Sequence, residues 1–441
     1  MQETKNTGGI RSFSRNFWTV ILMELFERGS YYGVMSVLSV YLVLGIDQGG
    51  LGFSKESVGV IKSTITPLLY ILPILSGAIA DRYGYKKVLT FAFLVMSTGY
   101  FLTSLSTTYT FVFASLLLMV VGAGCFKPII SGTIARETNE SNSTLGFGIF
   151  YWSINLGAFI FPLLLVPYLK AISWNYIFIM AAVGTGWLFF LNLFVYKEPA
   201  RPAVAGKVSD MLKNVVLVLK DIRFMSMILI YSGFWILYFQ MFDTVLWYLT
   251  EHVDVTPVNQ VVNRFLGLFT ENPDWKFDAE HVTVINAFAI ISLQLVVSSI
   301  VKHTPALPTM ITGLLIATAG MACLAISTSV WIFIAGIFIF SIGEMVAHPK
   351  FISYVGLIAP EDKKALYLGY SFLYGVIGSG IGGILGAKLY VHYVDELNQP
   401  DMLWLIFSGI GLVTIFGLMA YHKFLAPENR AKQIPATLLK S

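Results

Sequence analysis

Residues 77–87 read Gly-Ala-Ile-Ala-Asp-Arg-Tyr-Gly-Tyr-Lys-Lys, and they lead from one long apolar segment, residues 56–80, into another, residues 87–107. Each segment is long enough to cross a bilayer, since a spanning helix needs about 20 apolar residues. Gly84 permits a tight turn between them, and the arginine and lysines of the stretch favour the cytoplasmic side of a membrane. This stretch therefore predicts two membrane-spanning helices joined by a short cytoplasmic loop.

The same alternation of apolar segments and polar punctuation extends over the whole chain. Of its 441 residues, 56% are apolar and only 12% are charged, which is about half the charge of a soluble domain. We predict an all-α membrane protein with twelve transmembrane helices in two six-helix bundles, residues 16–196 and 224–424, joined by a basic cytoplasmic linker at 197–223. The predicted spans are 16–45, 56–80, 87–107, 109–136, 146–169, 173–196, 224–250, 282–302, 306–327, 330–357, 364–392 and 400–424.

The distribution of lysine and arginine predicts the orientation, because these residues concentrate on the cytoplasmic side of membrane proteins. With the N-terminus inside, far more of them fall on the inner side than on the outer side. We therefore expect cytoplasmic tails at 1–15 and 425–441 and an extracytoplasmic loop at 251–281. The protein is expected to be a multi-pass monomer in a plasma membrane, and its compact loops suggest a bacterial inner membrane.

Several classes of function are disfavoured by the sequence. The net charge of +4 comes without a basic stripe, so nucleic-acid binding is not expected. Cys125 and Cys323 lie in apolar segments without metal-ligand spacing, so we expect no disulfide, metal or cofactor. There is no Walker loop, HExxH or nucleophile elbow, which argues against an enzyme or a membrane-embedded sensor.

Two six-helix halves around a basic linker resemble the major facilitator superfamily, whose members bind substrate near the midplane of the membrane. The stretch 77–87 is similar to the GxxxDRxGRR-type signature of that superfamily. The resemblance implies gating roles for Asp81, which can form charge-assisted hydrogen bonds, and for Arg82. It carries no information about the substrate.

The first apolar segment contains charges that a membrane span rarely carries. Helical spacing places Glu24, Glu27, Arg28 and Tyr31 on one face, at i, i+3, i+4 and i+7. A charge within a membrane usually faces a water-filled cavity and serves function. Two carboxylates beside an arginine can exchange a proton for another partner, so we predict a proton-coupling site at Glu24, Glu27 and Arg28.

Four motifs resemble the proton-coupled oligopeptide transporters, a family within that superfamily. The stretch from Glu24 to Gly33 is similar to the ExxERFxYYG signature, although Gly29 stands where the family has an aromatic or small polar residue. The other three are Phe150-Tyr151-Trp152-Ser153-Ile154-Asn155-Leu156-Gly157, similar to FYxxINxG, Gly122-Ala123-Gly124-Cys125-Phe126-Lys127-Pro128, similar to GxGxxKP, and Glu344 with Pro349, similar to ExxxSP.

This resemblance implies a proton-coupled symporter that takes up di- and tripeptides or related zwitterionic compounds by alternating access. It assigns the protons to Glu24 and Glu27, and the substrate carboxylate to Arg28 and Lys127. Glu344 would meet the substrate's amino terminus, because a zwitterion needs cations at one end and an anion at the other. The remaining candidates for substrate contacts are Tyr31, Tyr151, Asn155, Trp235, Gln240 and Asn286.

The outer gate is where the sequence departs from the family. Asp243 resembles an acidic gate residue whose partner is a cation in the first span, but Met35 stands at the cation's position. Lys62 is the candidate replacement, with outward snorkelling as the alternative. His348 stands where the family motif has serine, and it either titrates near neutral pH or packs helices.

A different substrate class remains open on the same fold. The alternative hypothesis is a transporter of a drug or another metabolite, which could work as an exporter. Competition by a panel of dipeptides separates the two hypotheses, because a drug transporter should ignore the peptide backbone.

Overall fold

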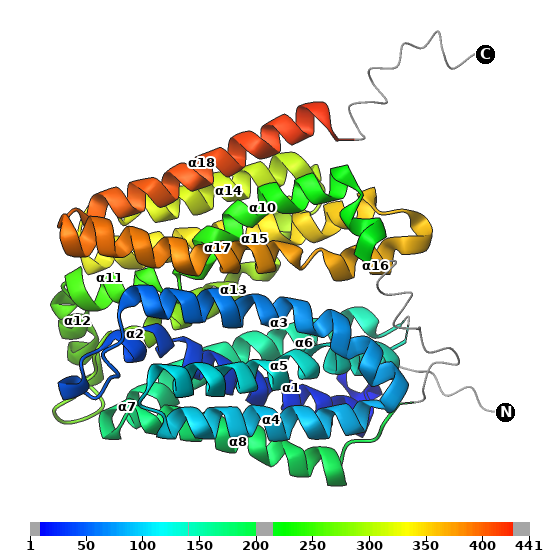
Figure 1. The fold of residues 1–441 in the computed structure, drawn as a ribbon, viewed down its shortest axis with the longest axis horizontal. Helices are drawn as coiled ribbons and strands as arrows, with labels where there is room; N and C mark the ends of the chain where they lie inside the picture. Colours follow the sequence, from blue (N-terminus) through cyan, green and yellow to red (C-terminus); the bar gives the residue numbers. More distant parts are fainter. Residues whose placement is uncertain (1–8, 140, 200–214, 427–441) are drawn as a thin grey trace. The chain divides into compact units, whose positions relative to one another are not determined.

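The computed structural model describes residues 9–139, 141–199 and 215–426, which fold into helices joined by short loops (Figure 1). Residues 1–8, 140, 200–214 and 427–441, which include most of the expected tails and linker, lie outside the described part. The chain divides into two compact units. The first comprises Met1–Val208 with Ala279–Ile291, and the second comprises Ser209–Asp278 with Ser292–Ser441.

The first unit contains the helices of the N-terminal half. The helix α1 begins where the hydroxyl of Ser14 accepts a hydrogen bond from the backbone N of Phe17 at 3.0 Å, a common way to satisfy the first backbone donors of a helix. The helices are α1 (Arg15–Met35), α2 (Leu38–Val43), α3 (Lys55–Tyr83), α4 (Tyr85–Leu105), α5 (Tyr109–Glu137), α6 (Ser143–Ile160), α7 (Val166–Ile172) and α8 (Asn175–Phe194), with a π-helical turn at Phe161–Leu165 between α6 and α7.

Helix contacts in the first unit position the charged face of α1. The helix α4 packs on α5 and α8, α3 packs on α5, and α1 packs on α6 and α8.

Gly84 joins α3 to α4 with φ of 102°, a left-handed value that favours glycine. The tight turn predicted at residues 77–87 is therefore present, and it depends on this residue.

The second unit contains the remaining helices, of which α13 is shared with the first unit because Ala279–Ile291 belongs there. Its close helix pair is α14 and α15, where a Cβ on Gly320 would lie 2.6 Å from the carbonyl oxygen of Gly336. The helices are α10 (Ile222–Gln240), α11 (Thr244–His252), α12 (Thr256–Leu266), α13 (Glu280–Val301), α14 (Ala306–Cys323), α15 (Val330–Ile358), α16 (Lys364–Tyr370), α17 (Leu373–Tyr390) and α18 (Pro400–Phe424), with a π-helical turn at Val391–Glu396 after α17.

Eleven helical segments in the described part of the chain are long and apolar enough to cross a membrane. The helix α1, with 21 residues, is a twelfth long helix. It is not among the eleven apolar helices because it contains the charged residues Glu24, Glu27 and Arg28. Every predicted span coincides with a helix or with two helices in sequence. The all-helical membrane fold predicted from the sequence is confirmed.

One segment contains structure that the sequence interpretation missed. Residues 251–281, expected as a loop, contain the helix α12. A backbone bridge between Asp254 and Ser329 ties the beginning of this segment to the residue before α15. Figure 1 shows α12 beside the end of α11.

Candidate functional site

The charged residues of α1 form a compact buried cluster in the first unit. Arg28 donates from Nε to Oε2 of Glu27 at 2.5 Å and from Nη2 to Oε1 of Glu27 at 2.7 Å. The side chain of Glu27 is fully buried and that of Arg28 is 9% exposed. A buried charge is stable only when it is paired and hydrogen-bonded, so the two-point contact explains how α1 carries this arginine.

Glu24 stands beside this pair without joining it. Its Oε1 lies 3.8 Å from Nε of Arg28, beyond hydrogen-bond distance. Its Oε2 is buried and has no hydrogen-bond partner among the described residues. A buried carboxylate with an unpaired oxygen is costly when charged and much less so when protonated. Of the two carboxylates, Glu24 is therefore better suited to carry a proton while Glu27 holds Arg28.

Two further predicted residues surround this cluster. The guanidinium of Arg28 lies 4.9 Å from the centre of the Tyr31 ring, a cation–π contact. Lys127 is exposed although it lies well inside α5, with its Nζ 5.4 Å from the centre of the Tyr70 ring. The charge of Lys127 acts on Glu24, Glu27 and Arg28. The structure therefore brings together five residues that the sequence interpretation selected.

The helix α6 approaches α1 closely next to the cluster. A Cβ on Gly157 would lie 2.7 Å from the carbonyl oxygen of Leu25 and 2.8 Å from the backbone N of Gly29, and a Cβ on Gly29 would clash with the Phe161 ring. Any larger residue at position 29 would push Phe161 aside. Close packing against Phe161 therefore explains why glycine stands at position 29, where the family has a larger residue.

The α6 candidates differ in exposure. Asn155 is buried, and its Nδ2 donates to the carbonyl oxygen of Tyr151 at 3.0 Å. The side chain of Tyr151 is 48% exposed. Tyr151 is thus the more accessible of the two, and a substrate role for either residue stays a prediction.

In the second unit, Glu344 and Trp235 lie at an aromatic cluster. We define this cluster by Tyr231, Trp235, His348 and Tyr374. The rings of Trp235 and Tyr374 stack with centres 4.5 Å apart, and His348 lies 5.3 Å from Trp235. The charge of Glu344, one turn before His348 on α15, acts on Tyr231 and Tyr374. The hydroxyl of Tyr231 lies 3.5 Å from Nδ1 of His348, and this contact favours helix packing for His348.

Gln240 has a packing role in this structure. Its side chain is fully buried, and its Nε2 donates to the carbonyl oxygens of Ile236 at 2.9 Å and Gly382 at 3.2 Å. The hydroxyl of Thr244 donates to its Oε1 at 3.0 Å. These bonds tie α10 to α17 at the point where α10 ends.

The other candidates occupy separate places. Asn286 is half-buried on the part of α13 that belongs to the first unit. Lys62 on α3 is 5% exposed and Asp243, between α10 and α11, is 4% exposed. Lys62 and Asp243 belong to different units, and their pairing stays a prediction.

Asp81 at the end of α3 contacts residues that the sequence interpretation did not name. Its Oδ1 accepts from the hydroxyl of Tyr85 at 3.1 Å and lies 3.3 Å from Nη2 of Arg136. The guanidinium of Arg136 also covers the Tyr85 ring, 4.5 Å from its centre. Arg82 is exposed beside Tyr83. Asp81 therefore connects α3 with α4 and α5, whereas Arg82 points outward.

A second buried ion pair was missed. Lys170 near the end of α7 donates to both carboxylate oxygens of Glu280, the first residue of α13, at 2.9 and 2.7 Å. Glu280 is 1% exposed and Lys170 is 15% exposed, and both residues belong to the first unit. The residues are 110 positions apart, so no local sequence pattern indicates the contact.

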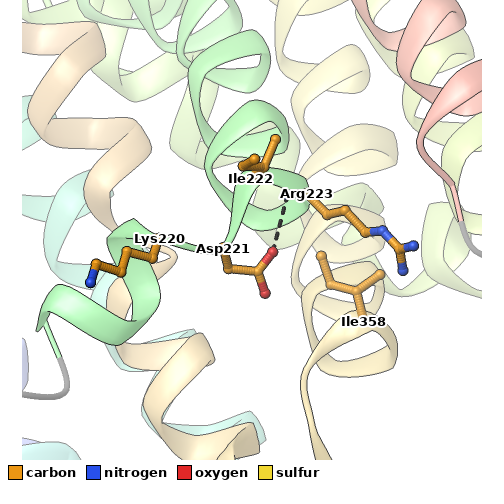
Figure 2. Close-up of a pocket in the computed structure, with 5 residues that line it drawn as sticks. All are labelled: Lys220, Asp221, Ile222, Arg223 and Ile358. Carbon is orange, nitrogen blue, oxygen red and sulfur yellow. Dashed lines mark hydrogen bonds between the residues drawn. The ribbon is translucent and has the colours of Figure 1, made fainter.

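A surface pocket of about 400 Å³ lies at the beginning of α10 in the second unit (Figure 2). The carboxylate of Asp221 accepts from the backbone N of Arg223 at 3.0 Å and from the hydroxyl of Tyr367 at 2.7 Å. Asp221 thus caps α10 and ties it to α16. None of the predicted site residues lines this pocket, whose walls are Lys220, Asp221, Ile222, Arg223 and Ile358.

Comparison with known proteins gives a family model and named relatives. The model of the Major Facilitator Superfamily matches residues 20–270 and 275–440. A peptide transporter of Yersinia enterocolitica is 28% identical over 213 residues, which cover 46% of this chain and only 41% of that protein. The dipeptide and tripeptide permease B of Salmonella typhimurium is 24% identical over 99% of this chain and 100% of its own length.

The fold is similar to solved transporter structures. The crystal structure of a peptide transporter, POT, in complex with sulfate superposes with a TM-score of 0.78 over 94% of each chain, at 19% identity. At that identity the likeness concerns the fold alone. The named relatives agree with the resemblance to oligopeptide transporters that the four motifs carry.

Proposed function

Since this chain belongs to the Major Facilitator Superfamily, we propose that it is a proton-coupled symporter that takes up di- and tripeptides or related zwitterionic compounds by alternating access. The substrate class rests on the motifs and on relatives named as peptide transporters. The observation that carries the proposal is the Arg28–Glu27 pair with Glu24 beside it, all three buried in one helix. We also propose cytoplasmic termini, a bacterial plasma membrane and a monomer.

The three charges support a simple coupling scheme. When Glu24 is ionised, both carboxylates attract Arg28. Moving the arginine or a carboxylate out of the cluster is then costly, because a buried charge would be left unpaired. A proton on either carboxylate removes one negative charge, which weakens the hold on Arg28 and frees its guanidinium donors. A substrate carboxylate can then take their place, because a guanidinium binds carboxylates at two points.

Lys127 supports recognition of the substrate carboxylate. It is exposed within the span, and its charge acts on the α1 cluster. A second cation next to Arg28 favours binding of an anion at this place. The motif resemblance assigns the substrate's amino group to Glu344, and the half-buried carboxylate on α15 is chemically suited to it.

The test is binding and uptake with peptides whose ends are blocked. In proteoliposomes with an inward proton gradient, we expect unlabelled dipeptides to compete with a labelled dipeptide. N-acetylated and C-amidated forms should compete at least about tenfold more weakly, because each loses one charged contact. Equal competition by capped and free peptides, or no competition by any peptide, would favour the drug or metabolite alternative.

A further inference from the structure

The helix α12 has an apolar side of which the structure buries only the beginning. Val258 is 5% exposed, and α12 packs against α15 of the same unit. Further along the same side, Val261, Phe265, Leu268 and Phe269 are 56%, 61%, 74% and 76% exposed. We call these four residues the apolar stripe.

The apolar stripe is continuous along the helix and its extension. Its residues lie at i, i+4, i+7 and i+8, which is one face of a helix. Helix-like bonds continue beyond Leu266, since the backbone N of Leu268 donates to the carbonyl oxygen of Phe265 and that of Phe269 donates to Leu266. The rings of Phe265 and Phe269 lie 5.4 Å apart. An exposed apolar face of this kind on a folded protein marks an interaction site.

The orientation of the stripe is fixed by bonds on another side of α12. The side chain of Asn263 donates to the carbonyl oxygen of Trp275 and accepts from its backbone N, both at 2.8 Å. Asn259 accepts from the backbone N of Phe277 at 2.8 Å. The backbone at Trp275 and Phe277 is therefore hydrogen-bonded to the polar side of α12, which leaves the stripe facing outward.

The position of α12 indicates what covers the stripe. The helix begins at Thr256, just after α11 ends at His252, so it starts at the end of a membrane span. The Asp254–Ser329 bridge ties this start to the beginning of α15, where Trp331 is 48% exposed. Tryptophan is enriched at the interface between membrane and water. The start of α12 is thus tied to the end of α15 that carries a residue suited to the lipid headgroups.

We propose that α12 is an interfacial helix whose apolar stripe inserts into the bilayer leaflet on the side of the 251–281 segment. Amphipathic helices of this kind lie in the membrane plane with their apolar side about 5–10 Å into the boundary between headgroups and acyl chains. Arg264 flanks the stripe and is exposed, so it can reach headgroup oxygens. The occupant is lipid, and the proposal does not depend on the transported substrate.

The test is the accessibility of spin labels on the full-length protein in lipid nanodiscs. Cys125 and Cys323 are first replaced by serine, and single cysteines are placed at Phe265 or Leu268 on the stripe and at Gln260 as the matched control on the same helix. We expect collisions with a water-soluble nickel complex to be at least about fivefold rarer at the two stripe positions than at Gln260, with oxygen collisions higher, as for a side chain in the interface.

Two results would overturn the proposal. Equal collision rates with the nickel complex at Leu268 and Gln260 would mean that the stripe faces water. A short distance between labels at Phe265 on two copies, measured in nanodiscs that hold two protein molecules, would mean that a second chain covers the stripe instead of lipid. A Phe269→Asp change should raise nickel access at Leu268, and no change in that access would also contradict insertion.

Discussion

Two buried ion pairs of the first unit resemble each other in geometry and differ in what stands next to them. Arg28 and Glu27 are joined by two bonds, and so are Lys170 and Glu280. Arg28 has a second carboxylate at 3.8 Å, whose other oxygen is unpaired. The ammonium of Lys170 instead lies 5.5 Å from the Trp174 ring. The additional carboxylate is therefore the feature that we propose for proton coupling.

This difference assigns distinct roles. The Arg28 cluster contains one carboxylate more than its cation hydrogen-bonds in the structure, so we expect a proton that arrives or leaves to change its bonding. The Lys170–Glu280 pair is matched one to one in its two bonds, and it fastens the beginning of α13 to the end of α7. We expect the first to determine proton coupling and the second to determine stability.

The largest effect is expected for Glu27→Gln. The change removes the charge that holds Arg28, and breaking a buried ion pair costs about 3–5 kcal/mol. Proton-driven dipeptide uptake in proteoliposomes should fall at least about tenfold, since 1.4 kcal/mol corresponds to a factor of ten. The matched control is Glu280→Gln, the same substitution in the other pair. If both variants lost proton dependence alike, the two pairs would not have separate roles.

The next largest effect is expected for Glu24→Gln. Wild-type uptake should rise as the external pH falls, because protons enter with the substrate. The amide at position 24 mimics the protonated acid, so uptake by this variant should not respond to a proton gradient, while dipeptide counterflow without a gradient should persist. Persistent stimulation of the variant by external acid would remove Glu24 from the coupling scheme.

A moderate effect on stability is expected at the second pair. Glu280→Gln and Lys170→Met should each lower the free energy of unfolding by about 1–3 kcal/mol, because each removes the charge-assisted bonds of a pair whose cation is 15% exposed. The double variant should be destabilised by less than the sum of the two. Thermal unfolding in detergent measures this cycle, and strict additivity of the two losses would mean that the observed bonds do not stabilise the protein.

The smallest effect on stability is expected at Asp81 and Arg136. Their side chains are 37% and 29% exposed at a separation of 3.3 Å, and such surface pairs contribute about 0–1 kcal/mol. Arg136→Gln should therefore shift the unfolding temperature little, and less still in high salt. A large destabilisation would show that this contact is a structural one, and it would weaken the gating role that the resemblance assigns to Asp81.

The sequence predicted the helices and the members of the α1 cluster, but not the bonds within it. Helical spacing placed Glu24, Glu27 and Arg28 on one face, and the structure adds that Arg28 bonds to the adjacent Glu27. Helical spacing determines the positions of the Cβ atoms, but not those of the charged groups at the ends of the side chains. The long side chain of Arg28 can therefore reach the residue next to it in sequence. The Lys170–Glu280 contact had no signal, because it depends on how α7 and α13 pack.

The helix α12 was not predicted, for a different reason. Residues 251–281 are polar and contain several acidic residues, which is typical of a loop. The apolar residues of α12 are too few for a membrane span, so a search for spans passes over them. Their spacing at i, i+4, i+7 and i+8 carries the helical signal, and it would have been found by testing the short segment for an apolar face.

The central claim is that the α1 cluster moves a proton together with the substrate. The most direct test loads proteoliposomes with a pH-sensitive dye and applies an inward dipeptide gradient without a proton gradient. We expect the lumen to acidify with the wild type and with Glu280→Gln, and not with Glu24→Gln or Glu27→Gln. Dipeptide entry into wild-type vesicles without acidification, or acidification that persists in Glu24→Gln or in Glu27→Gln, would contradict proton coupling at the α1 cluster.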